Sequence, residues 1–217
     1  MGKEVIQEMN ILTKIKHGAI EATGKTLIAK HPMYLVYHPE IHKVRGKAAW
    51  GTAHFVQPCD ILLRRFDGYL NTIFTELITN YITAEDHIKG FWGHAGFYVG
   101  DYTMVHSVSK GCIREHVLDF LRADAIAVLR IPGLTYAEKR IMLKIANLMA
   151  DAKVPYDLDF IRGNWASYCC ETVNTITGGI YDQDYVMFGK HEVLLPDAMF
   201  HSEASEVVLT INYEGRT

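Results

Sequence analysis

The alternation of apolar and polar residues divides the chain into short strands in its middle and helices on either side. Apolar residues recur every three or four positions in segments 3–22, 70–82, 136–152 and 169–176, a spacing that predicts helices. Short apolar runs bounded by turn residues predict strands over 61–63, 94–99, 103–108, 112–117, 124–131 and 207–211. Gly100 and Asp101, between two of these strands, are typical of a β-hairpin.

The order of the elements predicts an α+β fold. Helices and antiparallel strands are segregated, and few strand–helix–strand units that would build a doubly wound parallel sheet are found. A length of 217 residues with 49% hydrophobic residues is enough for one domain with a sizeable core. We expect an N-terminal helical extension over 1–55 and a main domain over 56–217.

Composition narrows the classes of partner and the cellular location. The formal net charge of -3 and the scattered basic residues argue against a nucleic-acid partner. Charges interrupt the N-terminus, so no signal peptide is predicted, and no apolar stretch is long enough to cross a membrane. The four cysteines do not form a disulfide scaffold. Reduced thiols and a cytoplasmic location are therefore expected.

Two adjacent cysteines, Cys169 and Cys170, stand where a helix is predicted to begin. Asn164 or Ser167 is the candidate capping residue, and Glu171 falls in the first turn. A cysteine at a helix N-terminus has a lowered thiol pKa and forms the reactive thiolate more readily. The first N–H groups of such a helix can also face a developing oxyanion. The alternative is that both cysteines are small buried core residues.

A thiolate nucleophile needs a base, which is most often a histidine. His94 is the candidate, because the glycine and alanine residues around it leave room for a substrate at the start of a strand. The alternative is a histidine at the edge of a sheet that faces solvent. His106, in the next strand, is the candidate to hold the tautomer of His94.

The hairpin geometry decides whether the two histidines can meet. A two-residue turn at Gly100 and Asp101 would place His94 opposite Ser107 and leave His106 on the other face of the sheet. A three-residue loop or a bulge would bring both histidines onto one face. We expect such a loop or bulge; without it, the orienting role passes to another polar group such as Ser107 or Gln57.

Other sites are weakly supported. His38 and His42 have the spacing of zinc ligands on a helix, but they lack the His-Glu-x-x-His order and an obvious third ligand. No complete phosphate-binding loop is present. We therefore expect neither a metal nor an organic cofactor.

Several short segments, taken in their order and spacing, carry a family resemblance. They are Cys59-Asp60-Ile61-Leu62, Gly93-His94-Ala95-Gly96, Val128-Leu129-Arg130, Tyr156-Asp157-Leu158-Asp159-Phe160, Tyr168-Cys169-Cys170-Glu171-Thr172-Val173 and Leu195-Pro196-Asp197-Ala198-Met199. This arrangement resembles the circularly permuted branch of the NlpC-like papain superfamily, above all its YiiX-like members. The resemblance covers roughly residues 59–211, and Cys59 stands where that family has a glycine.

The resemblance implies roles for individual residues. Cys169 takes the position of the nucleophile, His94 that of the base, and His106 that of the third polar residue, which varies in this superfamily. Cys170 takes the position of the family's serine. The hydroxyl of Tyr168 is a candidate to help the backbone N–H groups near Cys169 stabilise an oxyanion.

The resemblance also implies a fold and an activity. The fold would be a permuted papain-like core, in which an antiparallel sheet packs against the helix that bears the nucleophile. The activity would be a cysteine-dependent hydrolase that forms a thioester acyl-enzyme, most simply a peptidase or amidase acting on peptides, including cell-wall peptides. Two alternatives stay open: a lipid-directed acyl hydrolase or acyltransferase, and a non-catalytic binding module that retains the fold.

Overall fold

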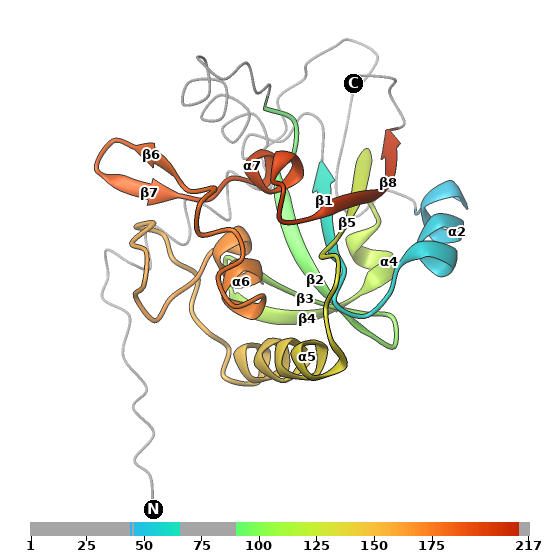
Figure 1. The fold of residues 1–217 in the computed structure, drawn as a ribbon, viewed down its shortest axis with the longest axis horizontal. Coiled ribbons are helices and arrows are strands. Elements are labelled where there is room, and N and C mark those ends of the chain that lie inside the picture. Colours follow the sequence, from blue (N-terminus) through green and yellow to red (C-terminus); the bar gives the residue numbers. More distant parts are fainter. Residues whose placement is uncertain (1–43, 45, 66–89, 213–217) are drawn as a thin grey trace, which may run out of the picture.

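The structure is a computed structural model that describes residues 44, 46–65 and 90–212 (Figure 1). Its helices are α2 (Gly46–Phe55), α4 (Val117–Phe120), α5 (Tyr136–Asp151), α6 (Cys169–Ile176) and α7 (Pro196–His201). Its strands are β1 (Ile61–Arg65), β2 (His94–Gly100), β3 (Thr103–Val108), β4 (Gly111–His116), β5 (Ala125–Arg130), β6 (Val186–Phe188), β7 (His191–Val193) and β8 (Glu206–Asn212). The helices predicted over 3–22 and 70–82 lie outside the described residues.

The centre of the fold is a six-stranded sheet in the order β4-β3-β2-β1-β5-β8, in which every neighbouring pair is antiparallel. β6 and β7 form a separate two-stranded hairpin. The predicted strands are all present, and the α+β class is confirmed. Helices α2, α4 and α7 and the β6–β7 hairpin are additions that the sequence pattern did not predict.

The sheet has two covered faces because successive side chains of a strand point to opposite sides. Ile61 of β1, Phe97 of β2 and Val105 of β3 share a core with Val173 of α6. This is the face on which α5 and α6 lie in Figure 1. On the other face, a second core of Leu62, Met104, Ile126 and Val128 packs against Phe120 of α4 and Ala48 of α2.

The β2–β3 hairpin contains the distortion that the histidine hypothesis requires. Its two-residue turn is Asp101 and Tyr102, one position later than predicted, and both have positive φ angles, of 46° and 56°. Gly100 pairs with Thr103, and the register then shifts between Tyr98 and Gly100 as a bulge. Beyond the bulge, Phe97 pairs with Val105 and Tyr98 with Met104, so even-numbered residues of both strands point to the same face of the sheet. His94 and His106 therefore share a face.

A buried ion pair holds the start of β1 to the end of β5. Asp60, only 2% exposed, accepts hydrogen bonds from Arg130 Nε at 2.8 Å and from the same guanidinium's Nη2 at 2.7 Å. It also accepts from the backbone N–H of Gln57 at 2.7 Å, while Arg130 donates to the Phe55 carbonyl at 2.6 Å. This arrangement gives a structural role to the aspartate and the arginine of two of the family-like segments.

Candidate active site

Cys169 is the first residue of α6, as the sequence predicts, but the cap of this helix differs from the expectation. The N-cap residue is Tyr168, and its side chain makes no capping hydrogen bond. The expectation that Asn164 or Ser167 caps α6 is therefore wrong. The Asn164 side chain accepts from the Ala166 N–H, and the Ser167 hydroxyl lies 2.8 Å from the hydroxyl of Thr172. Both side chains are engaged elsewhere, and the helix begins two residues after Ser167, with Tyr168 as its N-cap.

His94 and His106 are in direct contact, as predicted. His94 Nε2 lies 2.8 Å from His106 Nδ1, and the two rings meet edge to face at an interplanar angle of 76°. His106 is completely buried in the sheet, where its ring packs edge-on against Phe120. The bulge in the hairpin is the cause of this pairing, because without it the two rings would lie on opposite faces.

His94 joins the two faces of the sheet. His106 points into the layer of α4, whereas α6 lies on the opposite face. His94 is the first residue of β2 and pairs with Arg64 close to the end of β1. At this end of the sheet its ring packs against Phe120, with the ring centroids 5.8 Å apart, and its charge is among the causes that lower the pKa of Cys169. The direct contact between Cys169 and His94 stays a prediction, which this effect on the thiol pKa supports.

The surroundings of Cys169 favour its thiolate. A hydrogen bond from the Cys170 thiol, whose Sγ lies 3.9 Å away, is the largest cause of a pKa well below the usual cysteine value. The charge and hydrogen bond of His94 and the backbone N–H of Ala95 add to this lowering, and burial opposes it. The pKa of Cys170 is raised instead, first by burial and then by its hydrogen bond to Cys169. Cys169 therefore has a lower thiol pKa than Cys170, as the sequence predicts.

The alternatives for the orienting residue are occupied elsewhere. The Ser107 hydroxyl lies 2.6 Å from the Thr172 hydroxyl and joins β3 to α6 on the face away from His106. Gln57 is exposed to solvent, and its backbone N–H donates to Asp60. His106 is the residue that the structure places against His94, and burial lowers its pKa well below the usual histidine value, with the charges of His94 and Arg64 as further causes.

Two tyrosines lie near the nucleophile. The Tyr168 hydroxyl accepts a hydrogen bond of 2.7 Å from the Leu194 N–H, so this phenol is tied to the segment before α7. Tyr156 lies in one of the family-like segments, and the sequence predicts no role for it. Burial raises the pKa of Tyr156, and the charges of Cys169 and Cys170 are further causes. Tyr156 is therefore a second phenol close to the nucleophile.

The segment that leads into His94 is fixed by Asp197 at the start of α7. One oxygen of this buried carboxylate accepts from the N–H groups of Phe91 and Trp92, at 2.8 and 3.1 Å. The aspartate of the last family-like segment thus positions the chain immediately before the candidate base.

Comparison with known families matches residues 60–212, more than half of the chain, to the permuted papain-like amidase enzymes of the YaeF/YiiX, C92 family. The chain belongs to this family. No curated protein and no solved structure matched the chain. The family resemblance inferred from the ordered segments is confirmed, and the protein is a cysteine hydrolase of the peptidase or amidase type.

This amidase has no helix, within the part of the chain that the structure describes, that combines the length and apolar character needed to cross a membrane. His38 and His42, the weak candidates for zinc ligands, lie outside the described residues. The division of the chain at residues 55 and 56 stays a prediction. Within the predicted extension, the described helix α2 packs Ala48 into the same core as Leu62.

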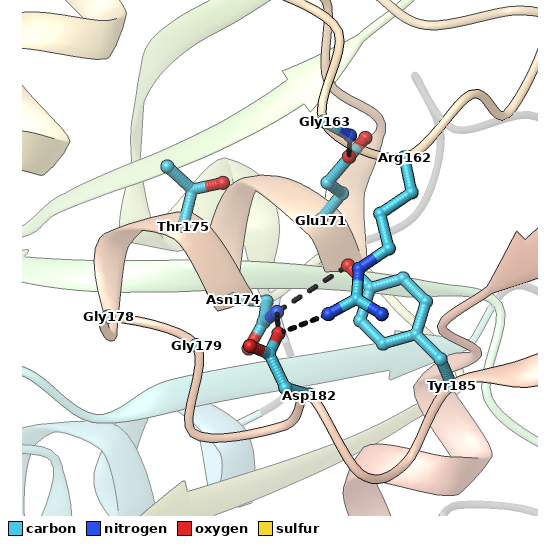
Figure 2. Close-up of a pocket in the computed structure, with 9 residues that line it drawn as sticks. All are labelled: Arg162, Gly163, Glu171, Asn174, Thr175, Gly178, Gly179, Asp182 and Tyr185. Carbon is cyan, nitrogen blue, oxygen red and sulfur yellow. Dashed lines mark hydrogen bonds and ion pairs between the residues drawn. The ribbon is translucent and has the colours of Figure 1, made fainter.

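A polar pocket of about 250 Å³ lies on the side of α6 that faces away from the sheet (Figure 2). Arg162 spans it, forming ion pairs of 2.9 Å with Asp182 and with Glu192, and stacks over the ring of Tyr185. Glu171 and the Asn174 side chain line its inner wall. This pocket therefore carries charged side chains of both signs.

Glu171 makes the stability of the fold depend on pH. Burial raises its pKa to about 7 from the usual glutamate value of 4.5, against the lowering effect of the Gly163 N–H. The folded protein thus holds this proton more tightly than the unfolded chain. Its stability falls as pH rises from about 4.5 to 7, because ionisation then costs more in the folded state.

Glu171→Gln is expected to remove most of this loss, because glutamine keeps an acceptor for Gly163 but carries no charge. We expect the fall in unfolding free energy between pH 5 and pH 8 to shrink by about 2 kcal/mol, a value reduced by water in the adjacent pocket. Denaturant unfolding at both pH values measures this. Glu192→Gln, which removes an exposed carboxylate bound to the same arginine, is the control. An equal pH effect in both variants would contradict the assignment to Glu171.

Proposed function

We propose that this chain hydrolyses amide bonds through a thioester at Cys169, with His94 as the base and His106 as the residue that orients His94. The observation that carries the proposal is the 2.8 Å contact between the rings of His94 and His106; it is supported by the lowered pKa of Cys169, of which His94 is one cause, and by the raised pKa of Cys170. A core cysteine pair without catalytic purpose would not need a histidine at its sulfur and a second histidine behind it.

The reaction would proceed in two steps. His94 holds the proton of Cys169, and the thiolate attacks the substrate carbonyl carbon to form a carbon–sulfur bond. Collapse of the tetrahedral intermediate breaks the carbon–nitrogen bond, and His94 gives the proton to the departing amine. Water then attacks the thioester, transfers a proton to His94, and releases the acid and the thiol.

The oxyanion of both steps would form at the N-terminus of α6. The N–H groups of the first turn of a helix have no partner within the helix and carry the positive end of its dipole. Tyr168 is the predicted phenolic helper, and Tyr156 is a second candidate because its phenol lies close enough to Cys169 to sense its charge. We assign the oxyanion site to the backbone of α6, with these phenols as candidate donors.

A peptide-like substrate is supported more than an acyl lipid, because the matched family consists of permuted papain-like amidases. We therefore propose a peptide or cell-wall peptide as the substrate.

Covalent labelling with a panel of electrophiles tests the proposal. We suggest comparing two thiol-reactive probes at equal concentration: peptidyl chloromethyl ketones and long-chain acyl chloromethyl ketones. The modified cysteine is then mapped by mass spectrometry. We expect labelling at Cys169, at least about tenfold faster with peptidyl probes, a difference of about 1.4 kcal/mol in transition-state binding. Faster labelling by acyl probes would favour the lipid-directed alternative. No labelling of Cys169 by any probe would favour a non-catalytic module.

A further inference from the structure

The polar contacts of the site continue beyond His106 to an acidic residue on the next strand. His106 is fully buried, and its Nδ1 is engaged by His94. The other ring nitrogen, Nε2, makes no well-aligned hydrogen bond among the described residues, yet the Glu115 Oε2 atom lies 3.4 Å from it. A buried N–H without an acceptor is costly, so a small rotation of Glu115 that completes this contact would be favoured.

Strand register explains why Glu115 reaches this place. In the β3–β4 ladder His106 pairs with Ile113 and Met104 pairs with Glu115, so Glu115 is the diagonal neighbour of His106 on the same face. Arg64 of β1, whose partner in the sheet is His94, donates from Nη1 to the same carboxylate oxygen at 3.3 Å. The Arg64 guanidinium also lies 4.3 Å above the Phe120 ring.

Only one arrangement of protons suits all of these contacts. A neutral His106 carries a single N–H. On Nε2, this N–H points at the carboxylate of Glu115, and Nδ1 is left as an acceptor for His94 Nε2–H. His94 then presents Nδ1 to Cys169. The opposite tautomer would set a bare Nε2 lone pair against the carboxylate oxygen, which is repulsive.

We propose that Glu115 is a positioning residue of this hydrolase: it selects the His106 tautomer and, through it, supports the imidazolium form of His94 while Cys169 is a thiolate. The proposal deepens the proposed function and rests on it. Glu115 does not act on the substrate; it acts through two histidine rings. Its side chain is 27% exposed, but its carboxylate lies 3.4 Å from the buried His106 ring.

The charges around the histidines set the expected direction of change. Arg64 from β1, Glu115 from β4 and Cys169 from α6 are the charged or titratable groups that face the pair among the described residues. Removing the carboxylate leaves the Arg64 charge beside the two rings, which disfavours an imidazolium. The thiolate–imidazolium pair should then be lost at lower pH.

Glu115→Gln and Glu115→Ala test the proposal, because glutamine keeps an acceptor without the charge and alanine removes both. For Glu115→Gln we expect the alkaline limb of the kcat profile to move down by about one pH unit and kcat near neutral pH to fall about tenfold, with KM unchanged. Glu115→Ala should fall further. The pH dependence of Cys169 alkylation by iodoacetamide should shift in parallel, and it needs no substrate.

Nitrogen NMR of the imidazole rings gives the readout that a merely structural role would not move. We expect the Nε2–H tautomer of His106 in the parent protein and in Glu115→Gln, and a mixture of tautomers in Glu115→Ala. Asp151→Asn is the matched control, because Asp151 also binds an arginine of β4, Arg114, at 2.7 Å, and has no contact with the histidines. It should keep the parent pH profile.

The outcomes separate the two proposals. Unchanged alkylation profiles and tautomers in both Glu115 variants would overturn the role of Glu115, whatever the activity. A loss of activity with unchanged profiles would overturn it as well, since that result indicates damage to the fold. If Cys169→Ala retained hydrolysis, the proposed function would fail instead, while the alkylation profile and NMR would still report on the contact between Glu115 and His106.

Discussion

Cys169→Ala is expected to abolish hydrolysis, with a loss of at least about a thousandfold in kcat/KM, because no other group can form the thioester. Cys170→Ser is expected to keep most of the activity. Adjacent residues on a helix point about 100° apart, so only one of the two sulfurs can face His94. We expect Cys169 to take that place, because His94 is among the causes that lower its pKa, whereas Cys170 is fully buried and its pKa is raised.

A third variant, Cys170→Ala, tests whether the hydrogen bond from Cys170 lowers the pKa of Cys169. The hydrogen bond from its thiol is the largest cause of the lowered pKa of Cys169. Serine keeps a donor at this position, whereas alanine removes it. We therefore expect Cys170→Ala to slow the alkylation of Cys169 near neutral pH by about tenfold, because the thiol pKa rises, and Cys170→Ser to leave it near the parent rate.

Iodoacetamide labelling followed by peptide mapping, together with hydrolysis of a peptide amide, measures all three variants. The order of labelling is the decisive observation: Cys169 should be modified first. Preferential modification of Cys170, or substantial hydrolysis by Cys169→Ala, would show that the nucleophile has been assigned to the wrong residue.

The reactive pair was predictable because its signals are local. A helix beginning at Cys169 and a glycine-flanked strand beginning at His94 can both be recognised from neighbouring residues. The contact between His94 and His106 required more, since it depends on a bulge that moves the register by one position. The sequence indicated that a bulge or longer loop was needed but not where; the register shift between Tyr98 and Gly100 places it.

The elements that escaped prediction depend on tertiary contacts. Helix α2 contains Gly51, a residue that disfavours helices, and the reason lies in packing. A side-chain carbon added there would lie 2.7 Å from Leu209 of β8, so the glycine lets the helix approach the sheet. Helix α4 has four residues and relies on the side chain of His116, which accepts from the Leu118 N–H. Such short elements leave no periodic pattern.

Glu115 escaped prediction for a related reason. Its distance from His106 is set by pairing between β3 and β4, where a shift of one residue would turn it to the other face. Cys59 is a case in which the structure explains a difference from the family pattern that is already visible in the sequence. Its φ angle of 79° lies in the left-handed region, which explains why the resembling family has a glycine at this position.

Asp60→Ala is expected to lower the free energy of unfolding by about 3 kcal/mol. The substitution removes the acceptor of two hydrogen bonds from Arg130 and one from the Gln57 N–H, and it leaves a guanidinium that is 25% exposed beside an apolar strand. Breaking a buried pair by removing one partner is costly because the remaining charge loses its compensation. Asp60→Asn, which keeps an acceptor for Gln57, should cost about half as much.

Asp151→Ala is the matched comparison, because the two ion pairs have the same oxygen–nitrogen distance but differ in how far the carboxylate is buried. Asp151 lies 2.7 Å from Arg114, the same separation as between Asp60 and Arg130, but its side chain is 64% exposed and that of Asp60 is 2% exposed. Water already solvates the exposed pair, so the loss of Asp151 should lower the free energy of unfolding far less than the loss of Asp60. Denaturant unfolding of the three variants at neutral pH measures the difference. Equal losses of unfolding free energy at Asp60 and Asp151 would mean that the ion pair between β1 and β5 does not stabilise this edge of the site. The stability of β1, on which Arg64 and the His94 strand depend, would then have to come from the surrounding apolar core alone.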